Sequence, residues 1–322
     1  MSEYAFELAL CAELEGTGDG LVGRQIGGGV TDPGRRIVDV VLVEPGPAFE
    51  RRTTITAEAI PSKVIEAAVG PGRFRYWKRA VEPLEGHPKH AERCIDRGID
   101  IGFLESRRQN GRRYVRQTTR YPDWFETLTA IENKPDLAAP GELETQLRHD
   151  VSLGVFDAVI LATASHVTGA HRNRIPDAVG IWRVDPTGDI EVLREPARLP
   201  VDAPGVEIGE RQPGSIDIDI VDPARKRSAR RRIAERVYGG GWRPQTVAAC
   251  GEMHVDGEGI PRCAYKGRIV RPSACGPDCP GHDPAEKPDY DSEAHRNRRS
   301  GWVAAPEGCV TEQSRLESFE GL

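Results

Sequence analysis

Two stretches decide the fold: Arg36-Ile-Val-Asp-Val-Val-Leu-Val43 and Leu128-Thr-Ala-Ile-Glu-Asn-Lys134. Both are rich in apolar and β-branched residues and are soon followed by a proline, so we predict that both are strands. Asp39 interrupts the apolar run of the first. Glu132 and Lys134, two residues apart in the second, are expected to share one face of the sheet. Because burying a lone carboxylate is costly, such groups are normally paired, protonated or bound to metal.

The flanking segments predict an α/β chain. Residues 4–15 are rich in Ala and Leu and are expected to form a helix, and residues 21–26 a short strand. Residues 141–155 place Leu or Val at every fourth position, which is typical of an amphipathic helix. Residues 157–163 predict a buried strand. With residues 57–120 set aside, the order is helix, strand, strand, strand, helix, strand.

Residues 57–120 differ in character and predict an inserted domain. Helices are expected at 57–69 and 88–97, and two alternating runs then flank Asn110-Gly111, a strong hairpin signal. Helices followed by a basic hairpin favour a winged-helix-like insertion. The predicted divisions are a discontinuous core at 1–56 and 121–200, this insertion at 57–120, a linker and arginine-rich helix at 201–241, and a cysteine-rich metal-binding tail at 242–322.

Charge is distributed unevenly along the chain. Residues 71–120 hold thirteen basic and six acidic residues, although the whole chain has a formal net charge of −6. Phe74, Tyr76 and Trp77 lie among the first of these basic residues, and such a pattern is typical of nucleic-acid contact. The alternative for residues 71–120 is a solvated charged surface. The arginine-rich helix at 223–237 is either a second clamp on DNA or a helix that pairs with acidic residues of the same chain. The predicted DNA-binding residues are Arg73, Arg75, Lys78, Arg79, Arg107, Arg108, Arg112, Arg113 and Arg116.

Composition narrows the class of protein further. Only seven of the 44 basic residues are lysines, and the many arginines and acids with few aromatics resemble proteins of salt-loving archaea. A mesophile with a GC-rich genome is the alternative source of this composition. No apolar run approaches the roughly 20 residues that span a bilayer. The chain also opens without a basic segment followed by an apolar stretch, so we expect a cytoplasmic protein without a membrane partner.

The acidic positions, taken in this order, resemble the PD-(D/E)XK nuclease superfamily, whose members have a restriction-endonuclease-like core. The resemblance rests on Glu7 in the first helix, Asp39 in the second strand and Glu132-x-Lys134 in the third. Gln146 follows in the next helix, as in RecB-like members of the superfamily. The implied fold class is α/β, with a restriction-endonuclease-like core of order αβββαβ.

This resemblance covers residues 3–56 and 121–165, and it departs from the superfamily pattern at two positions. The tyrosine expected four residues after the RecB-like glutamine is Asp150. The proline usually found before the first acid of the motif is Val38. The whole chain also resembles an uncharacterised protein family of salt-loving archaea.

The resemblance implies a nuclease, dependent on Mg²⁺ or Mn²⁺, that hydrolyses DNA phosphodiester bonds. Asp39 and Glu132 would hold the ion, which polarises the phosphate and activates a water molecule. Lys134 would position that water or neutralise charge developing on phosphorus. Glu7 would bind a second ion or tune the first, and Gln146 would orient the water or a phosphate.

Two other functions compete with this interpretation. One is a non-catalytic nucleic-acid-binding protein that keeps a degenerate nuclease fold and a zinc-stapled tail. The other is a structural or interaction protein. Convergence of Glu7, Asp39, Glu132 and Lys134 within metal-binding distance would favour the nuclease over the non-catalytic protein. Scattering of these four residues would favour the structural or interaction protein.

The cysteines of the tail predict a metal. Four of them are separated by 12, 11 and 3 residues, and four thiolates suit a structural Zn²⁺. The alternative is an iron–sulfur cluster, because some RecB-like nucleases join an N-terminal cysteine to three C-terminal ones and Cys11 lies in the first predicted helix. Cys94 and Cys309 are expected to be free of metal. The predicted ligands are Cys250, Cys263, Cys275 and Cys279.

Overall fold

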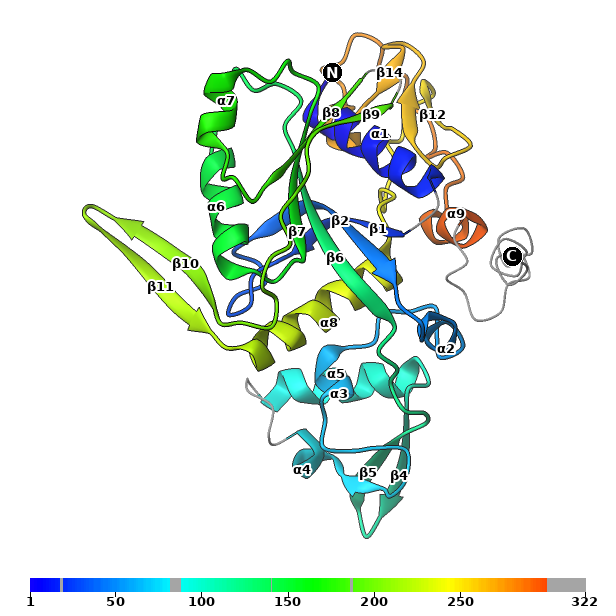
Figure 1. Cartoon of the computed structure of the whole chain (residues 1–322). Helices are drawn as coiled ribbons and strands as arrows, with labels where there is room; N and C mark the ends of the chain where they lie inside the picture. Colours follow the sequence, from blue (N-terminus) through cyan, green and yellow to red (C-terminus); the bar gives the residue numbers. More distant parts are fainter. Residues whose placement is uncertain (18–19, 82–87, 140, 186–187, 300–322) are drawn as a thin grey trace, which may run out of the picture.

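The computed structural model describes residues 1–17, 20–81, 88–139, 141–185 and 188–299. Its centre is a six-stranded sheet of order β1-β2-β6-β7-β8-β9 (Figure 1), which together with the surrounding helices confirms the α/β class. The strands are β1 (Leu21–Gly27), β2 (Ile37–Pro45), β6 (Phe125–Asn133), β7 (Ala158–Thr163), β8 (Gly180–Val184) and β9 (Ile190–Arg194).

The sheet is mixed and is covered on both faces. The pairs β1–β2, β2–β6 and β8–β9 are antiparallel, whereas β6–β7 and β7–β8 are parallel. Ile131 and Ile160 pack with α1 (Glu3–Gly16) on one face. On the other face, Ala130 and Leu161 share a core with α6 and α8. The remaining helices of this part are α6 (Leu143–Leu153), α7 (Gly169–Arg174) and α8 (Pro223–Gly240).

The element order α1, β1, β2, β6, α6, β7 is the predicted one once the insertion is set aside. Aliphatic and β-branched residues produce β2 and β6, as expected, because they pack well on a pleated surface buried on both faces. The helix predicted at 141–155 is α6, which ends at Gly154 with φ 57°, a left-handed cap that glycine adopts without strain.

The insertion forms a small unit with its own core. A three-stranded antiparallel sheet of order β3-β5-β4 packs against helices around Ile95, Phe103 and Val115. Asn110 and Gly111 have φ of 50° and 73°, which confirms the predicted hairpin turn. Its elements, with α2 just before it, are α2 (Phe49–Thr53), α3 (Ser62–Ile65), β3 (Arg75–Tyr76), α4 (Trp77–Val81), α5 (Pro88–Asp100), β4 (Leu104–Gln109) and β5 (Arg112–Gln117).

One helix of the insertion is shorter than predicted. The sequence predicts a helix over 57–69, but only α3 forms there, at Ser62–Ile65. Pro61 immediately precedes α3 and disfavours helical geometry at Ile60, so a helix cannot run through from residue 57.

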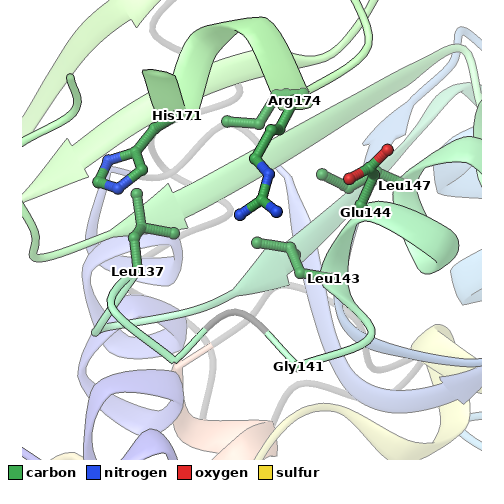
Figure 2. A pocket seen from close by; sticks show the side chains of 8 residues that line it. Leu137, Gly141, Leu143, Glu144, Leu147, His171 and Arg174 are labelled. Carbon is green, nitrogen blue, oxygen red and sulfur yellow. The ribbon is translucent and has the colours of Figure 1, made fainter. Parts of the chain in front are cut away.

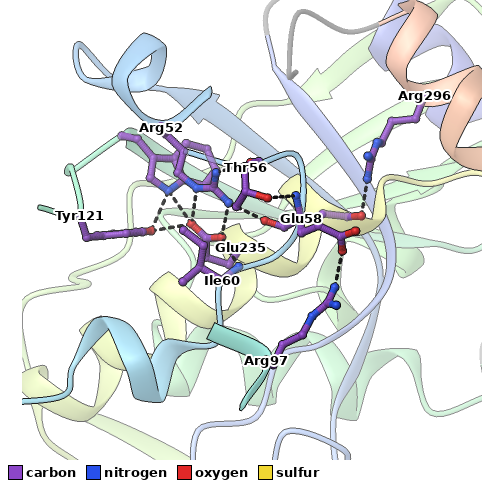
Figure 3. A network of polar contacts seen from close by, with 10 residues as sticks. Arg52, Thr56, Glu58, Ile60, Arg97, Tyr121, Glu235 and Arg296 are labelled. Carbon is purple, nitrogen blue, oxygen red and sulfur yellow. Dashed lines mark hydrogen bonds and ion pairs between the residues drawn. The ribbon is translucent and has the colours of Figure 1, made fainter. Parts of the chain in front are cut away.

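A buried carboxylate on α8 joins the insertion to the core (Figure 3). Glu235 accepts hydrogen bonds from Arg52 Nε and Nη2 at 2.8 and 2.7 Å and from the Ile60 backbone N–H at 2.8 Å. It also accepts from Tyr121 Oη at 2.8 Å and Trp124 Nε1 at 3.1 Å. These donors flank both points where the chain enters and leaves the insertion, so one residue holds both crossings in place.

The linker expected before the arginine-rich helix, over residues 200–222, contains a β-hairpin instead. β10 (Gly205–Gln212) pairs with β11 (Ser215–Val221), and the hairpin projects from the core (Figure 1). Alternating Ile and Asp over 216–220 is a strand pattern, which the surrounding Pro, Gly and Asp conceal in the sequence. Glu207 anchors the hairpin by accepting hydrogen bonds from the Val30 and Thr31 backbone N–H groups at 2.9 and 2.8 Å.

The arginine-rich helix predicted at 223–237 is α8, and much of its basic face is directed inward. Arg230 is buried and pairs with Asp157 at 2.7 Å. Lys226 is buried and donates to two backbone carbonyls, and Arg232 donates to the Gly29 carbonyl. Of the two interpretations of this helix, these contacts support pairing within the molecule rather than a second clamp on DNA.

The tail packs against α1 and also has a small core of its own around Met253 and Val270. Trp242, Ile260 and Ile269 belong to the α1 core, and Arg243 pairs with Glu15 at 2.6 Å. Among the helices of the described ranges, none is both long and apolar enough to cross a membrane. The tail elements are β12 (Met253–Val255), β13 (Pro261–Cys263), β14 (Arg268–Ile269), the 3₁₀ turn η1 (Pro272–Ala274) and α9 (Ser292–Arg299).

Candidate functional site

Glu7 of α1 and Asp39 of β2 converge on one side chain of β1. Gln25 Nε2 lies 3.3 and 3.1 Å from the two Glu7 carboxylate oxygens and 3.2 Å from Asp39 Oδ1. Asn133 of β6 completes the group: its backbone N–H donates to Asp39 Oδ2 and its Nδ2 to Glu7 Oε2, each at 3.0 Å. We call Glu7, Gln25, Asp39 and Asn133 the carboxylate–amide cluster.

The strand geometry at this cluster is irregular. Gln25 has φ 55°, a left-handed conformation that is uncommon for a residue other than glycine and that concentrates at functional sites. On the paired strand, Val38 packs on the sheet face covered by α6 and α8, whereas Val40 packs on the face covered by α1. Residues two apart in a regular strand would lie on the same face. The alternation of faces along β2 therefore breaks at Asp39, where its carboxylate meets Gln25.

The electrostatics of the cluster favour a positive group. Burial raises the pKa of Glu7; the adjacent Arg24 guanidinium, 2.9 Å away, opposes this shift, and the charge of Asp39 adds to it. Burial also raises the pKa of Asp39, opposed by the hydrogen bond from the Asn133 backbone. Two neighbouring carboxylates that are both costly to ionise gain from a shared cation.

Glu132 belongs to a second, adjacent cluster on the α6 side. Its carboxylate lies 2.5 Å from Arg36 Nη2, and the same guanidinium donates to Asp150 of α6 at 3.0 and 2.6 Å. His149 Nδ1 lies 3.4 Å from Asp150. Burial raises the pKa of Glu132, the Arg36 charge opposes this, and Asp39 and Asp150 add to it. The two clusters are therefore close enough to interact electrostatically.

Lys134 and Glu132 do not share an environment, contrary to expectation. Lys134 pairs with Glu3 at the start of α1, whereas Glu132 contacts Arg36 on the α6 side. β6 ends at Asn133, so the two-residue alternation of a strand does not extend to Lys134.

Gln146 is half-buried on α6, one turn before Asp150. It is Asp150, the departure from the RecB-like pattern, that reaches Glu132 through Arg36. The sequence pattern assigns no role to Asp150, and it does not mark Gln25, Arg36 or Asn133 as site residues.

The described part of the chain shows no ready-made metal site of acidic, His or Cys side chains. Within the described ranges, no group of three or more His, Cys, Asp or Glu side chains is placed to hold a metal ion. Of the predicted Mg²⁺ ligands, Asp39 shares the Gln25 side-chain amide with Glu7 as a common hydrogen-bond donor. Glu132 is instead paired with Arg36.

The basic residues of the insertion lie over its aromatic rings. The guanidinium carbons of Arg107 and Arg116 lie 4.4 and 4.7 Å from the centre of the Phe74 ring, and that of Arg113 lies 5.2 Å from the centre of Trp77. The aromatics expected to stack on bases are thus covered by arginine side chains.

Acidic residues partly balance this surface. Arg113 pairs with Asp96 at 2.5 Å, and Arg116 pairs with Glu105 at 2.8 Å, and both arginines are half-buried. The other members of the predicted set are exposed: Arg73, Arg75, Lys78, Arg79, Arg107, Arg108 and Arg112.

The four tail cysteines lie in one region, although no three of them are placed to hold a metal ion within the described ranges. Cys250, Cys263 and Cys275 share a small core, and burial raises the pKa of Cys275, with the charges of Cys250, Cys263 and Cys279 adding to the shift. Cys11 is buried in the separate α1 core, so its position gives no support to a shared iron–sulfur cluster.

Two further cysteines are expected to be free of metal. Cys94 is in the insertion, 3.7 Å from His90 Nε2, and Cys309 lies outside the described residues.

A small, largely apolar pocket opens between α6 and α7 (Figure 2). Glu144, His171 and Arg174 contribute polar groups to it. The pocket contains none of the predicted catalytic residues and neither carboxylate cluster. Its remaining lining residues are Leu137, Gly141, Leu143, Leu147 and Ile175.

Comparison with known proteins identifies a family. Residues 21–284 match DUF5787, which is described as a family of unknown function. The matched residues include β1, the insertion, β6, α6 and most of the tail. No curated protein and no solved structure matches the chain. Because the match covers well over half of the 322 residues, the chain belongs to the family of unknown function DUF5787.

Proposed function

We propose that this protein is a divalent-cation-dependent nuclease that hydrolyses DNA phosphodiester bonds. The observation that carries the proposal is the convergence of Glu7, Asp39 and Asn133 where α1, β2 and β6 meet. The element order α1, β1, β2, β6, α6, β7 supports a restriction-endonuclease-like core, in which acidic residues at these places serve phosphodiester hydrolysis.

The donor set suits a hard cation. Carboxylate and amide oxygens are the ligands that Mg²⁺ and Mn²⁺ prefer, and Glu7, Asp39 and Asn133 supply both types. When bound, such an ion lowers the pKa of a water molecule and neutralises charge on a phosphate. Lys134 lies near the start of α1, beside Glu3, and would provide a positive charge for a phosphate approaching that end of the helix.

The insertion supports DNA as the substrate. Its order of helix, strand, helix, helix, strand, strand and its sheet order β3-β5-β4 support the interpretation of a winged-helix-like insertion. The exposed arginines at the β4–β5 hairpin, Arg107, Arg108 and Arg112, present positive charge of the kind that binds the phosphate backbone.

One observation favours the alternative of a non-catalytic nucleic-acid-binding protein. Arg36 neutralises Glu132, and Lys134 is paired with Glu3, so two residues of the resemblance are engaged in ion pairs. An inactive member of the fold would keep the insertion and bind DNA without cleaving it.

The tail cysteines complete the proposal. Their gathering around Cys275 supports a structural zinc ion, with an iron–sulfur cluster as the alternative. The zinc would hold the tail against α1 and would take no part in hydrolysis.

Incubation of the purified protein with single-stranded and double-stranded DNA, with Mg²⁺ or Mn²⁺ and with EDTA, tests the function. We expect fragments only when the divalent ion is present, and none with Asp39→Ala. Binding of DNA without cleavage under every condition would favour the non-catalytic alternative. Equal cleavage by both proteins would place the activity elsewhere or in a contaminant.

A further inference from the structure

We propose that the protein binds one divalent cation between Glu7 and Asp39, with the side-chain oxygen of Asn133 as its third protein ligand. In this assignment Glu132 is not a ligand, because its charge is already balanced by the ion pair with Arg36. The inference rests on the proposed nuclease function and deepens it. It moves the cation from the predicted Asp39–Glu132 pair to the carboxylate–amide cluster.

The first support is an unsatisfied buried atom. Asn133 is only 6% exposed, and its Oδ1 finds no hydrogen-bond donor in the described part of the chain. The rest of the residue is engaged in the cluster, since its backbone N–H bonds Asp39 and its Nδ2 bonds Glu7. A buried carbonyl oxygen without a partner is destabilising, and a cation beside it would remove that penalty.

The second support is the position of Gln25. Its single amide nitrogen lies within 3.3 Å of three carboxylate oxygens, two from Glu7 and one from Asp39. A weakly positive NH₂ group thus fills the space between two acids, where a full positive charge would be more favourable. Rotation about the last side-chain torsion exchanges the nitrogen of Gln25 for its oxygen, which would then face a cation as a fourth donor.

The third support concerns Glu132. Arg36 is 5% exposed, and its donors bond Glu132, both oxygens of Asp150 and the Ile37 carbonyl. A cation at Glu132 would have to displace a buried guanidinium held on several sides, and removing one partner of a buried ion pair is strongly unfavourable. The geometry therefore supports one exchangeable cation beside one fixed guanidinium.

Mn²⁺ titration of the full-length protein without DNA, followed by the electron paramagnetic resonance signal of free Mn²⁺, tests the assignment. We expect one bound Mn²⁺ per chain. Asn133→Ala should weaken binding by about tenfold or more, the range seen when groups supporting a metal are removed. Asn133→Asp should restore or strengthen binding, because it returns an oxygen ligand with added charge. Glu132→Gln should leave the affinity within about threefold of wild type.

Several results would overturn the assignment. They are two Mn²⁺ per chain, no binding by the wild-type protein, or loss of binding in Glu132→Gln with retention in Asn133→Ala. Near-UV circular dichroism identifies any variant that has not folded, and Asn133→Asp then carries the comparison. Mn²⁺ bound as expected without DNA cleavage refutes the nuclease function alone. Cleavage combined with the Glu132-dependent pattern refutes the ligand assignment alone.

Discussion

Arg36 Nη2 lies 2.5 Å from Glu132 Oε1, inside the protein. This ion pair links the beginning of the β2 stretch to the end of β6, and through Asp150 it reaches α6. The acid that most resembles a metal ligand in the sequence is therefore part of the structural interior. The proposed cation is assigned instead to Glu7 and Asp39, of which Glu7 also pairs with Arg24 at 2.9 Å.

Arg36→Met should destabilise the fold by about 3–5 kcal/mol, because Glu132 and Asp150 would remain buried as charges without a counter-ion. Urea denaturation followed by circular dichroism measures the change. Arg35→Met, at the exposed neighbouring position, is the matched control and should change stability by less than about 0.5 kcal/mol. Similar losses in both variants would contradict the role given to Arg36.

A further variant separates charge from packing. Combining Arg36→Met with Glu132→Gln and Asp150→Asn removes all three charges together. It should recover part of the lost stability, since no buried charge is then left unpaired. A triple variant less stable than Arg36→Met would indicate that the two acids have other partners.

Glu235→Gln should destabilise the protein by about 3 kcal/mol or more, because the fully buried Arg52 loses its only anionic partner in the described structure. Chemical denaturation measures the loss, and limited proteolysis should show faster cutting at the two crossings into the insertion. Glu50→Gln, at an exposed position on α2, serves as control. Unchanged proteolysis with unchanged stability would show that the insertion is held by other contacts.

Replacing Arg107, Arg108 and Arg112 with Gln should weaken DNA binding and lower the slope of log Kd against log salt by about 2–3, if each contacts one phosphate. Fluorescence anisotropy at several salt concentrations measures both quantities. The control triple variant, Arg172→Gln, Arg198→Gln and Arg227→Gln, removes equal charge from exposed positions outside the insertion. Equal weakening by the two variants would mean that only overall charge matters.

Metal analysis of the purified protein should find one tightly bound zinc, and Cys263→Ser should lose it and loosen the tail. Cys94→Ser, in the insertion, is the matched control and should retain zinc. A brown protein that contains iron would favour an iron–sulfur cluster over zinc. Absence of both metals would refute the prediction of a metal in the tail.

The sequence predicts the central sheet well where local pattern and burial agree. β2 and β6 follow from their runs of apolar and β-branched residues, and the β4–β5 turn follows from Asn110-Gly111. The β10–β11 hairpin was not predicted because Pro, Gly and Asp surround the alternating Ile and Asp of β11 and favour a linker. Ile216, Ile218 and Ile220 are exposed, so this strand forms without the buried face that its alternating pattern normally indicates.

The candidate site was predicted in part. Glu7 and Asp39 stand out because a charge is unexpected within an apolar segment. Gln25 and Asn133 carry no charge, so nothing in the local pattern marks them, and only the pairing of β1, β2 and β6 brings them to the two acids. The separation of Glu132 from Lys134 depends on where β6 ends, which strand periodicity alone does not specify.

The most direct test of the central claim is the single-turnover rate of cleavage of end-labelled DNA in Mg²⁺. The measurement compares the wild-type protein with Asp39→Asn and with Asp202→Asn, an exposed control of identical charge change. We predict that Asp39→Asn cleaves at least about 100-fold more slowly, a loss of about 2.7 kcal/mol of transition-state stabilisation, while the Asp202 variant matches wild type. Cleavage by Asp39→Asn at the wild-type rate would contradict a cation-dependent site built on Asp39.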